Sequence, residues 1–226
     1  MKYTKRQFGK FLDHSALKPY FGEKDIIRMA AEAKKWEFAA LSVNPHYTAL
    51  AARELKGTDI HVNPCIAFPF GAISPEWKAW EAEKCIQQGA TEIDMVANIG
   101  AIIEGKWNLV RDDIEAVVKV AKDIEVKVII ETAYLTNDDL KIKAALVVAE
   151  AGGAYVKTST GYAPGGATVH DIKLLYNTVG NRIKVKAAGG IRHYEDAVVM
   201  IQSGASRVAS SSTIQIMVEG GYHNSA

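Results

Sequence analysis

Two segments, Gly153-Ala-Tyr-Val-Lys-Thr-Ser-Thr160 and Ile183-Lys-Val-Lys-Ala-Ala-Gly-Gly190, each join an apolar, strand-like run containing a lysine to a turn of small residues. Strands that end at the mouth of a β/α barrel have this character. A lysine facing a barrel interior loses hydration, which favours its neutral form, and a second ammonium nearby acts in the same direction. Because a neutral amine condenses with carbonyls, Lys157 and Lys186 indicate Schiff-base chemistry. The alternative is that one or both lysines lie on the solvent side of an edge strand.

The same pattern of short β-rich runs and longer helical segments continues along the whole chain. The helical segments carry apolar residues at three- and four-residue spacing. The predicted strands are residues 11–14, 39–43, 61–67, 92–96, 127–131, 155–158, 183–187 and 207–209. The predicted helices include residues 24–35, 75–88, 107–122, 137–151, 168–178 and 193–203. Such alternation requires a parallel sheet.

Two arrangements accommodate this pattern, an open doubly wound sheet and a closed barrel. An open dinucleotide-binding sheet would carry a glycine fingerprint after its first strand, and none is present there. Eight strands in 226 residues favour an α/β fold made of one (β/α)8 TIM-barrel domain over residues 1–226. Asn137 and Thr168 predict helix starts, and Gly89 and Gly152 predict helix ends.

Composition narrows the choice of partners. The 27 basic and 26 acidic residues leave a net charge of +1, so we expect small-molecule partners rather than nucleic acid or an anionic membrane surface. No run approaches the roughly 18 apolar residues of a membrane span, and we expect a cytoplasmic protein. Cys65 and Cys85 have no metal or redox spacing and are interpreted as buried thiols.

Asp94 interrupts the run Ile93-Asp-Met-Val96, which otherwise has the composition of a buried parallel strand. A carboxylate in such a place must be paired, either in a structural ion pair or with Lys157 and Lys186 as a proton-exchanging group. His14, beside Asp13 at a predicted strand end, either lines the barrel mouth or is a core imidazole. The six histidines show no pair at metal-ligand spacing, so no metal site is expected.

Small and hydroxyl residues follow the last strands, where barrels often bind phosphate. Each of these residues alone is equally compatible with a turn or a helix cap. Together they predict a phosphate-binding site. The candidates are Gly161, Gly165, Gly166, Gly189, Gly190 and Ser210 to Ser212.

Six motifs, in order and spacing, make the chain similar to one known family. The motifs are Leu12-Asp-His-Ser-Ala-Leu-Lys-Pro19, Ile66-Ala-Phe-Pro-Phe-Gly71, Gly89-Ala-Thr-Glu-Ile-Asp-Met-Val-Ala-Asn-Ile-Gly100, Val128-Ile-Ile-Glu-Thr132, Val156-Lys-Thr-Ser-Thr-Gly161 and Val185-Lys-Ala-Ala-Gly-Gly-Ile-Arg192. They resemble the deoxyribose-phosphate aldolases, which are class I aldolases.

The resemblance implies reversible cleavage of 2-deoxy-D-ribose 5-phosphate to acetaldehyde and D-glyceraldehyde 3-phosphate, in deoxyribose phosphate catabolism. By resemblance, Lys157 is the Schiff-base lysine, Lys186 is the second lysine that promotes its neutral form, and Asp94 is the acid/base partner. No metal or organic cofactor is implied, because the protonated imine is itself the electron sink. The residues in the family's phosphate-binding positions are Gly161, Gly189, Gly190, Ser211 and Ser212.

The chain also departs from the family pattern. Tyr162 occupies a position where some members place a phosphate-binding lysine, so phosphate binding is expected to depend more on backbone donors. Ser42 replaces a cysteine that is vulnerable to aldehydes in many relatives, which predicts resistance to acetaldehyde. Ala209 replaces a glycine before the terminal serines. Tyr222 is a candidate counterpart of a C-terminal tyrosine that covers the active site in some members.

Two other functions are compatible with these residues: a Schiff-base aldolase for a different aldol, and a non-catalytic barrel that binds a sugar phosphate. Retention of the lysine pair with Asp94 argues against the second, because a binder needs no reactive amine. We also expect a homo-oligomer, dimer or tetramer. Trp36, Trp77 and Trp80 either pack against a partner subunit or cover the strands of their own barrel.

Overall fold

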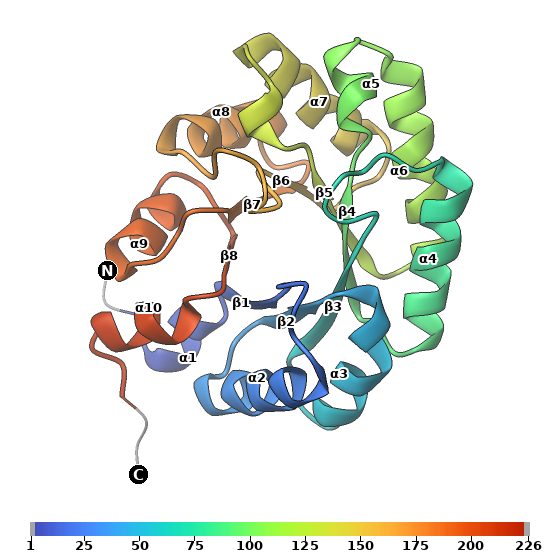
Figure 1. Ribbon diagram of the computed structural model, residues 1–226. Helices are drawn as coiled ribbons and strands as arrows, with labels where there is room; N and C mark the ends of the chain where they lie inside the picture. Colours follow the sequence, from blue (N-terminus) through green and yellow to red (C-terminus); the bar gives the residue numbers. More distant parts are fainter. Residues whose placement is uncertain (1–2, 224–226) are drawn as a thin grey trace.

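The computed structural model describes residues 3–223 and shows eight parallel strands closed into a barrel (Figure 1). The strands are β1 (Leu12–Ala16), β2 (Ala40–Val43), β3 (His61–Ile66), β4 (Glu92–Val96), β5 (Glu125–Ile129), β6 (Tyr155–Lys157), β7 (Lys184–Ala188) and β8 (Arg207–Ser210). Each strand pairs with its neighbours in sequence, and β1 pairs with β8 to close the sheet. The predicted TIM barrel is therefore confirmed.

Helices form a ring around the strands (Figure 1). They are α1 (Lys5–Gly9), α2 (Glu23–Trp36), α3 (Thr48–Glu54), α4 (Pro75–Gln87), α5 (Ile99–Ile103), α6 (Trp107–Ala121), α7 (Asp138–Glu150), α8 (Val169–Val179), α9 (Tyr194–Gln202) and α10 (Thr213–Glu219), with 3-10 turns at Pro45–Tyr47 and Thr132–Tyr134. The six predicted helices are present. The prediction did not include α1, α3, α5 and α10, because five to seven residues are too few to show helical periodicity.

Side-chain caps and glycines set several helix ends as predicted. Asn137 Oδ1 accepts a hydrogen bond from the backbone N–H of Leu140 at 2.9 Å, and Thr168 Oγ1 accepts one from the N–H of Asp171 at 3.0 Å. Gly89 and Gly152, with φ of 102° and 84°, adopt the left-handed backbone that ends α4 and α7.

Two predicted strands were displaced along the sequence, while the other six agree within one residue at each end. β1 begins at Leu12 because the N–H of Phe11 bonds the carbonyl of Phe8 in the turn after α1. β5 ends at Ile129 instead of residue 131, since Glu131 has a left-handed backbone with φ of 51°.

Alternation along the strands separates two environments. Leu12, Leu41 and Val128 face the apolar layer beneath the helices, whereas residues of the opposite parity, such as Asp94 and Lys157, are buried and paired inside the barrel. Most TIM barrels fill their interior with branched apolar side chains. The interior of this barrel is instead charged.

The structure tests two further expectations, about the cysteines and the tryptophans. Cys65 and Cys85 are buried free thiols, as predicted. Trp36 is only 6% exposed and covers its own barrel, so it is unavailable to a partner, whereas Trp77 and Trp80 on α4 are 63% and 53% exposed.

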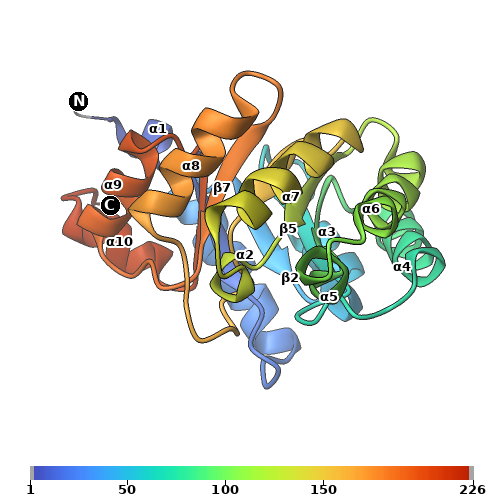
Figure 2. The ribbon, with the colours of Figure 1, turned by 90° about the horizontal axis from the view of Figure 1, so that it is seen from above.

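Figure 2 shows α1, α9 and α10 grouped at one side, where the rings of Phe8 and Tyr194 lie 5.0 Å apart. Within residues 3–223, no helix has the length and apolarity of a membrane span.

Candidate active site

Lys157 is the last residue of β6, and its side chain is 2% exposed. It lines a cavity of about 160 Å³ whose wall comes from the loops after β1, β6, β7 and β8. Its Nζ donates a hydrogen bond to Asp94 Oδ2 at 2.6 Å. Lys157 therefore presents a buried amine at the base of a cavity, with a carboxylate in contact.

Asp94, in the middle of β4, is fully buried and shared by several cations. Besides Lys157, it accepts hydrogen bonds from Lys186 Nζ, at 2.8 Å to Oδ2 and 3.1 Å to Oδ1. Burial by itself would raise the pKa of Asp94, but the ammonium groups of Lys157, Lys186 and Lys127 outweigh it and hold that pKa well below its ordinary value. The Asp94 carboxylate is therefore held in its ionised form next to Lys157.

Lys186 lies opposite Lys157 across the β6–β7 pair and is also fully buried. Its Nζ contacts Asp13 Oδ2 at 2.5 Å as well as Asp94. Burial would lower the pKa of Lys186, but the charges of Asp13 and Asp94 prevail and raise it. Lys186 thus remains a fixed ammonium. Both lysines contact Asp94 Oδ2, so their nitrogens are separated by no more than the sum of those two distances.

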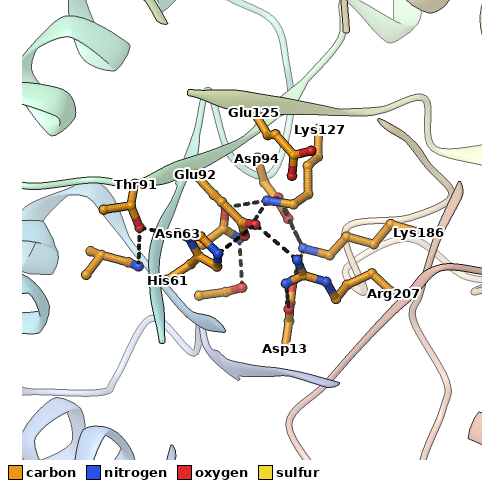
Figure 3. A network of polar contacts seen from close by, with 12 residues as sticks. Asp13, His61, Asn63, Thr91, Glu92, Asp94, Glu125, Lys127, Lys186 and Arg207 are labelled. Atoms are coloured by element: carbon orange, nitrogen blue, oxygen red, sulfur yellow. Dashed lines mark hydrogen bonds and ion pairs between the residues drawn. The ribbon is translucent and has the colours of Figure 1, made fainter. Parts of the chain in front are cut away.

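The structure adds four side chains that the sequence analysis did not assign to the site (Figure 3). Arg207 Nη1 bonds Asp13 Oδ1 at 2.6 Å, and its Nη2 bonds Glu92 Oε1 at 3.0 Å. Lys127 Nζ bonds Glu92 Oε2 at 2.7 Å and lies 3.6 Å from Asp94 Oδ1. Asp13, Glu92, Lys127 and Arg207 therefore continue the ion network of Asp94 through the barrel interior.

The network has an unequal number of charges. At ion-pair distance, Lys127, Lys157, Lys186 and Arg207 share three buried carboxylates among the described residues, those of Asp13, Glu92 and Asp94, while the buried Glu131 acts on Lys157 from farther away. Within the described chain, Lys157 alone of the four cations contacts a single carboxylate at ion-pair distance and also lines the cavity. Lys157 is therefore the cation of this network that a bound substrate can reach.

A sequence signal for Lys127 was available. It alternates with Val126 and Val128 in a strand-like run, just as Lys157 and Lys186 do in theirs. The predicted strand began at residue 127, which left this lysine at a strand end without an assigned environment. In the structure β5 begins at Glu125, and register pairs Lys127 with Asp94. Burial lowers the pKa of the Lys127 ammonium.

The predicted phosphate residues divide into two groups. Gly161, Gly189, Gly190, Ser210 and Ser211 line the cavity. The three glycines have φ of 88°, 88° and 78°, a backbone that other residues rarely adopt, so these turns present unhindered backbone at the cavity wall.

Ser212 and Gly166 do not line the cavity. The N–H of Ser212 donates to Ser210 Oγ at 2.9 Å, and Ser212 stands at the N-cap position of α10 without a capping hydrogen bond from its side chain. A Cβ on Gly166 would lie 2.3 Å from the carbonyl oxygen of Gly189, so Gly166 allows two loops to approach closely. Its role is therefore packing. The sequence alone could not distinguish a glycine that faces a ligand from one that faces another loop. Gly165 likewise lies outside the cavity wall.

Two aromatic candidates lie away from the cavity. His14 points outward from β1, where Nε2 contacts Glu32 at 3.0 Å and Nδ1 contacts Thr213 Oγ1 at 2.6 Å. These contacts make His14 a core imidazole rather than a mouth residue. Burial lowers the pKa of His14. The ring of Tyr222 stacks on that of Phe8 at 5.3 Å, so the expectation that it covers the cavity is wrong.

Glu131 braces the loop that follows Lys157. Its Oε2 accepts hydrogen bonds from the N–H of Thr160 at 3.1 Å and from Thr160 Oγ1 at 2.5 Å. Burial raises the pKa of Glu131. In turn, Thr160 Oγ1 accepts a hydrogen bond from the N–H of Tyr162 at 3.0 Å. The loop between β6 and α8 is thus tied to the end of β5.

Comparison with known proteins relates this chain to named sequences. A family model described as DeoC/LacD family aldolase matches residues 10–213. The chain is 49% identical over 211 residues to the deoxyribose-phosphate aldolase of Streptococcus suis (strain 98HAH33), covering 93% of this chain and 96% of the relative. It is 50% identical over 215 residues to the deoxyribose-phosphate aldolase of Thermococcus gammatolerans, covering 93% and 95%.

A solved structure is also similar. The deoxyribose phosphate aldolase from Aeropyrum pernix, described as a unique tetrameric structure, superposes with a TM-score of 0.88 at 28% identity. The match covers 95% of this chain and 91% of that one. Fold and sequence therefore agree on one family.

Proposed function

Because the chain belongs to the DeoC/LacD family of aldolases, we propose that it is a deoxyribose-phosphate aldolase that works through a Schiff base on Lys157. The substrate is 2-deoxy-D-ribose 5-phosphate, and the products are acetaldehyde and D-glyceraldehyde 3-phosphate. The observation that carries the mechanism is the buried amine of Lys157, which lines the cavity beside Asp94 and within reach of the fixed ammonium of Lys186.

In the cleavage direction, neutral Lys157 attacks C1 of the open-chain sugar, and loss of water gives a protonated imine. The C3 hydroxyl then loses its proton as the C2–C3 bond breaks, which releases glyceraldehyde 3-phosphate and leaves an enamine. Protonation at C2 and hydrolysis release acetaldehyde and return the amine. The protonated imine accepts the electron pair of the broken bond, so the steps require no other electron sink.

The neighbouring groups have different roles in this proposal. Asp94, kept ionised by its cations, takes and returns protons, assisted by water. Lys186, kept charged by Asp13 and Asp94, disfavours a second positive charge on Lys157. Gly161, Gly189, Gly190 and Ser211 would meet the phosphate at the cavity wall. Ser212 would act indirectly, because its N–H donates to Ser210 Oγ beside Ser211.

Trapping tests the covalent step. Incubation with acetaldehyde and borohydride should add one ethyl group to Lys157, identified by peptide mass spectrometry. The Lys157→Ala variant should lose both the adduct and turnover, whereas the exposed control Lys24→Ala should retain both. An unmodified protein, or an adduct on Lys186 alone, would contradict the mechanism. Comparing 2-deoxyribose 5-phosphate with another aldol would test the substrate.

We also propose that the protein acts as a homo-oligomer in the cytoplasm. The exposed, edge-to-face pair of Trp77 and Trp80, with rings 5.9 Å apart, supports a subunit interface. The two free thiols suit a reducing compartment. Light scattering should give a mass above one chain, reduced in a Trp77→Glu, Trp80→Glu variant. A monomeric wild type would contradict the assembly.

A further inference from the structure

The cavity wall is unusual in its charges. Among the residues that the structure describes, no aspartate or glutamate contributes to it, while three cations do: Lys157 at the base, Lys18 after β1 and Arg192 after β7. Lys18 and Arg192 are exposed, and within residues 3–223 neither side chain has a carboxylate at ion-pair distance. Two uncompensated cations thus approach the cavity from separate loops.

Tyr162 holds Lys18 at this position. The phenol OH of Tyr162 donates to the carbonyl of Leu17 at 2.8 Å, which ties the loop after β6 to the loop after β1. The ring of Tyr162 packs edge-on against Phe68 at 5.5 Å, and Lys18 Nζ lies 6.0 Å from its centroid. A cation–π contact at an exposed ring is weak, so an anion entering the cavity can displace it.

We infer that Lys18 determines specificity for a phosphorylated substrate, by supplying from the β1 loop a cationic contact to the phosphate monoester. This inference rests on the proposed function. A phosphate dianion prefers charge-assisted donors, and the backbone groups of the β6 and β7 loops carry no full charge. Lys18 therefore supplements the backbone donors, and the sequence-based expectation that those donors predominate is incomplete. Tyr162 is a positioning residue, because it directs Lys18 and the β1 loop toward the cavity.

The test compares Lys18→Met with wild type on phosphorylated and free 2-deoxyribose. We expect kcat/KM for the 5-phosphate to fall about ten- to hundredfold, mainly through KM, as for loss of one hydrogen bond to a charged group. Cleavage of free deoxyribose should change less than about twofold. Inorganic phosphate, used as a competitive inhibitor of free-sugar cleavage, should show a higher Ki in the variant. Lys24→Met, an exposed lysine outside the cavity wall, is the matched control.

The outcomes separate this inference from the proposed function. If wild type forms no adduct on Lys157 and cleaves neither sugar, the proposed function fails. If wild type prefers the phosphorylated sugar and Lys18→Met keeps both that preference and the Ki for phosphate, only the role of Lys18 fails. Loss of the preference in Arg192→Met but not in Lys18→Met would likewise overturn the assignment. Tyr162→Leu should reproduce part of the Lys18→Met effect on the phosphorylated sugar.

Discussion

Replacement of Lys186 by leucine tests the electrostatic core of the mechanism. The nitrogens of Lys157 and Lys186 lie 2.6 and 2.8 Å from the same oxygen of Asp94. Two unit charges about 5 Å apart repel by about 3 kcal/mol at an effective dielectric constant of about 20. Replacement of Lys186 by leucine removes this repulsion, while Asp94 continues to attract the Lys157 ammonium.

We therefore expect the pH at which imine formation is half-maximal to rise in Lys186→Leu. The assay is borohydride trapping of acetaldehyde between about pH 5 and 10, with the Lys157 adduct quantified by mass spectrometry. Turnover of deoxyribose 5-phosphate at neutral pH should fall in parallel. The fold should survive, because Asp13 keeps Arg207 at 2.6 Å and Asp94 keeps Lys157, although loss of a buried partner costs about 3–5 kcal/mol.

Lys78→Met is the matched control for that cost. Lys78 is also fully buried and bonds Asp113 at 2.7 Å, but it lies in the helix layer on α4, outside the barrel interior. It should destabilise the protein without moving the pH midpoint. A folded Lys186→Leu protein with an unchanged midpoint would refute the coupling. An equal shift in Lys78→Met would show that the effect is unspecific.

Three other measurements examine neighbouring groups. Asp94→Asn should lower kcat by about a hundredfold or more, since it removes a proton acceptor in contact with the amine, and near-normal kcat in a folded variant would exclude that role. Wild type should resist concentrated acetaldehyde, because Ser42 is not a thiol and burial raises the pKa of Cys65 to about 12. The Ser42→Cys variant should be inactivated faster by acetaldehyde, and equal inactivation rates would disprove this explanation. Burial alone would raise the pKa of Asp13, but Arg207 and other cations lower it. The ion pair of Asp13 therefore stabilises the fold above the unfolded pKa of about 3.9. That stabilisation is lost as the pH falls toward the depressed pKa of the folded state. Denaturant unfolding of Asp13→Asn should therefore give lower stability at pH 7 and a shallower decline between about pH 5 and 3, and identical slopes would contradict the ion pair's role.

Local pattern was sufficient for the architecture. Eight short apolar runs, six of them followed by a predicted helical segment, imply parallel strands, and their number and spacing favour closure. The runs containing Asp94, Lys157 and Lys186 were recognisable because a charge in a buried strand is costly and must have a partner. Asn137 and Thr168 likewise cap their helices through contacts within four residues, which a sequence displays directly.

Orientation and partners needed the tertiary structure. Successive strand residues face opposite sides, so a displacement of one or two residues in a strand boundary changes the assigned environment: Asp13 faces the ion network, while His14 faces Glu32. Lys127 joined the site only through the register of β5 against β4. The contact between Tyr162 and Leu17 spans most of the barrel sequence. Strands and helices follow from neighbours along the chain, but charge balance inside a barrel depends on which strands close the sheet and in which register.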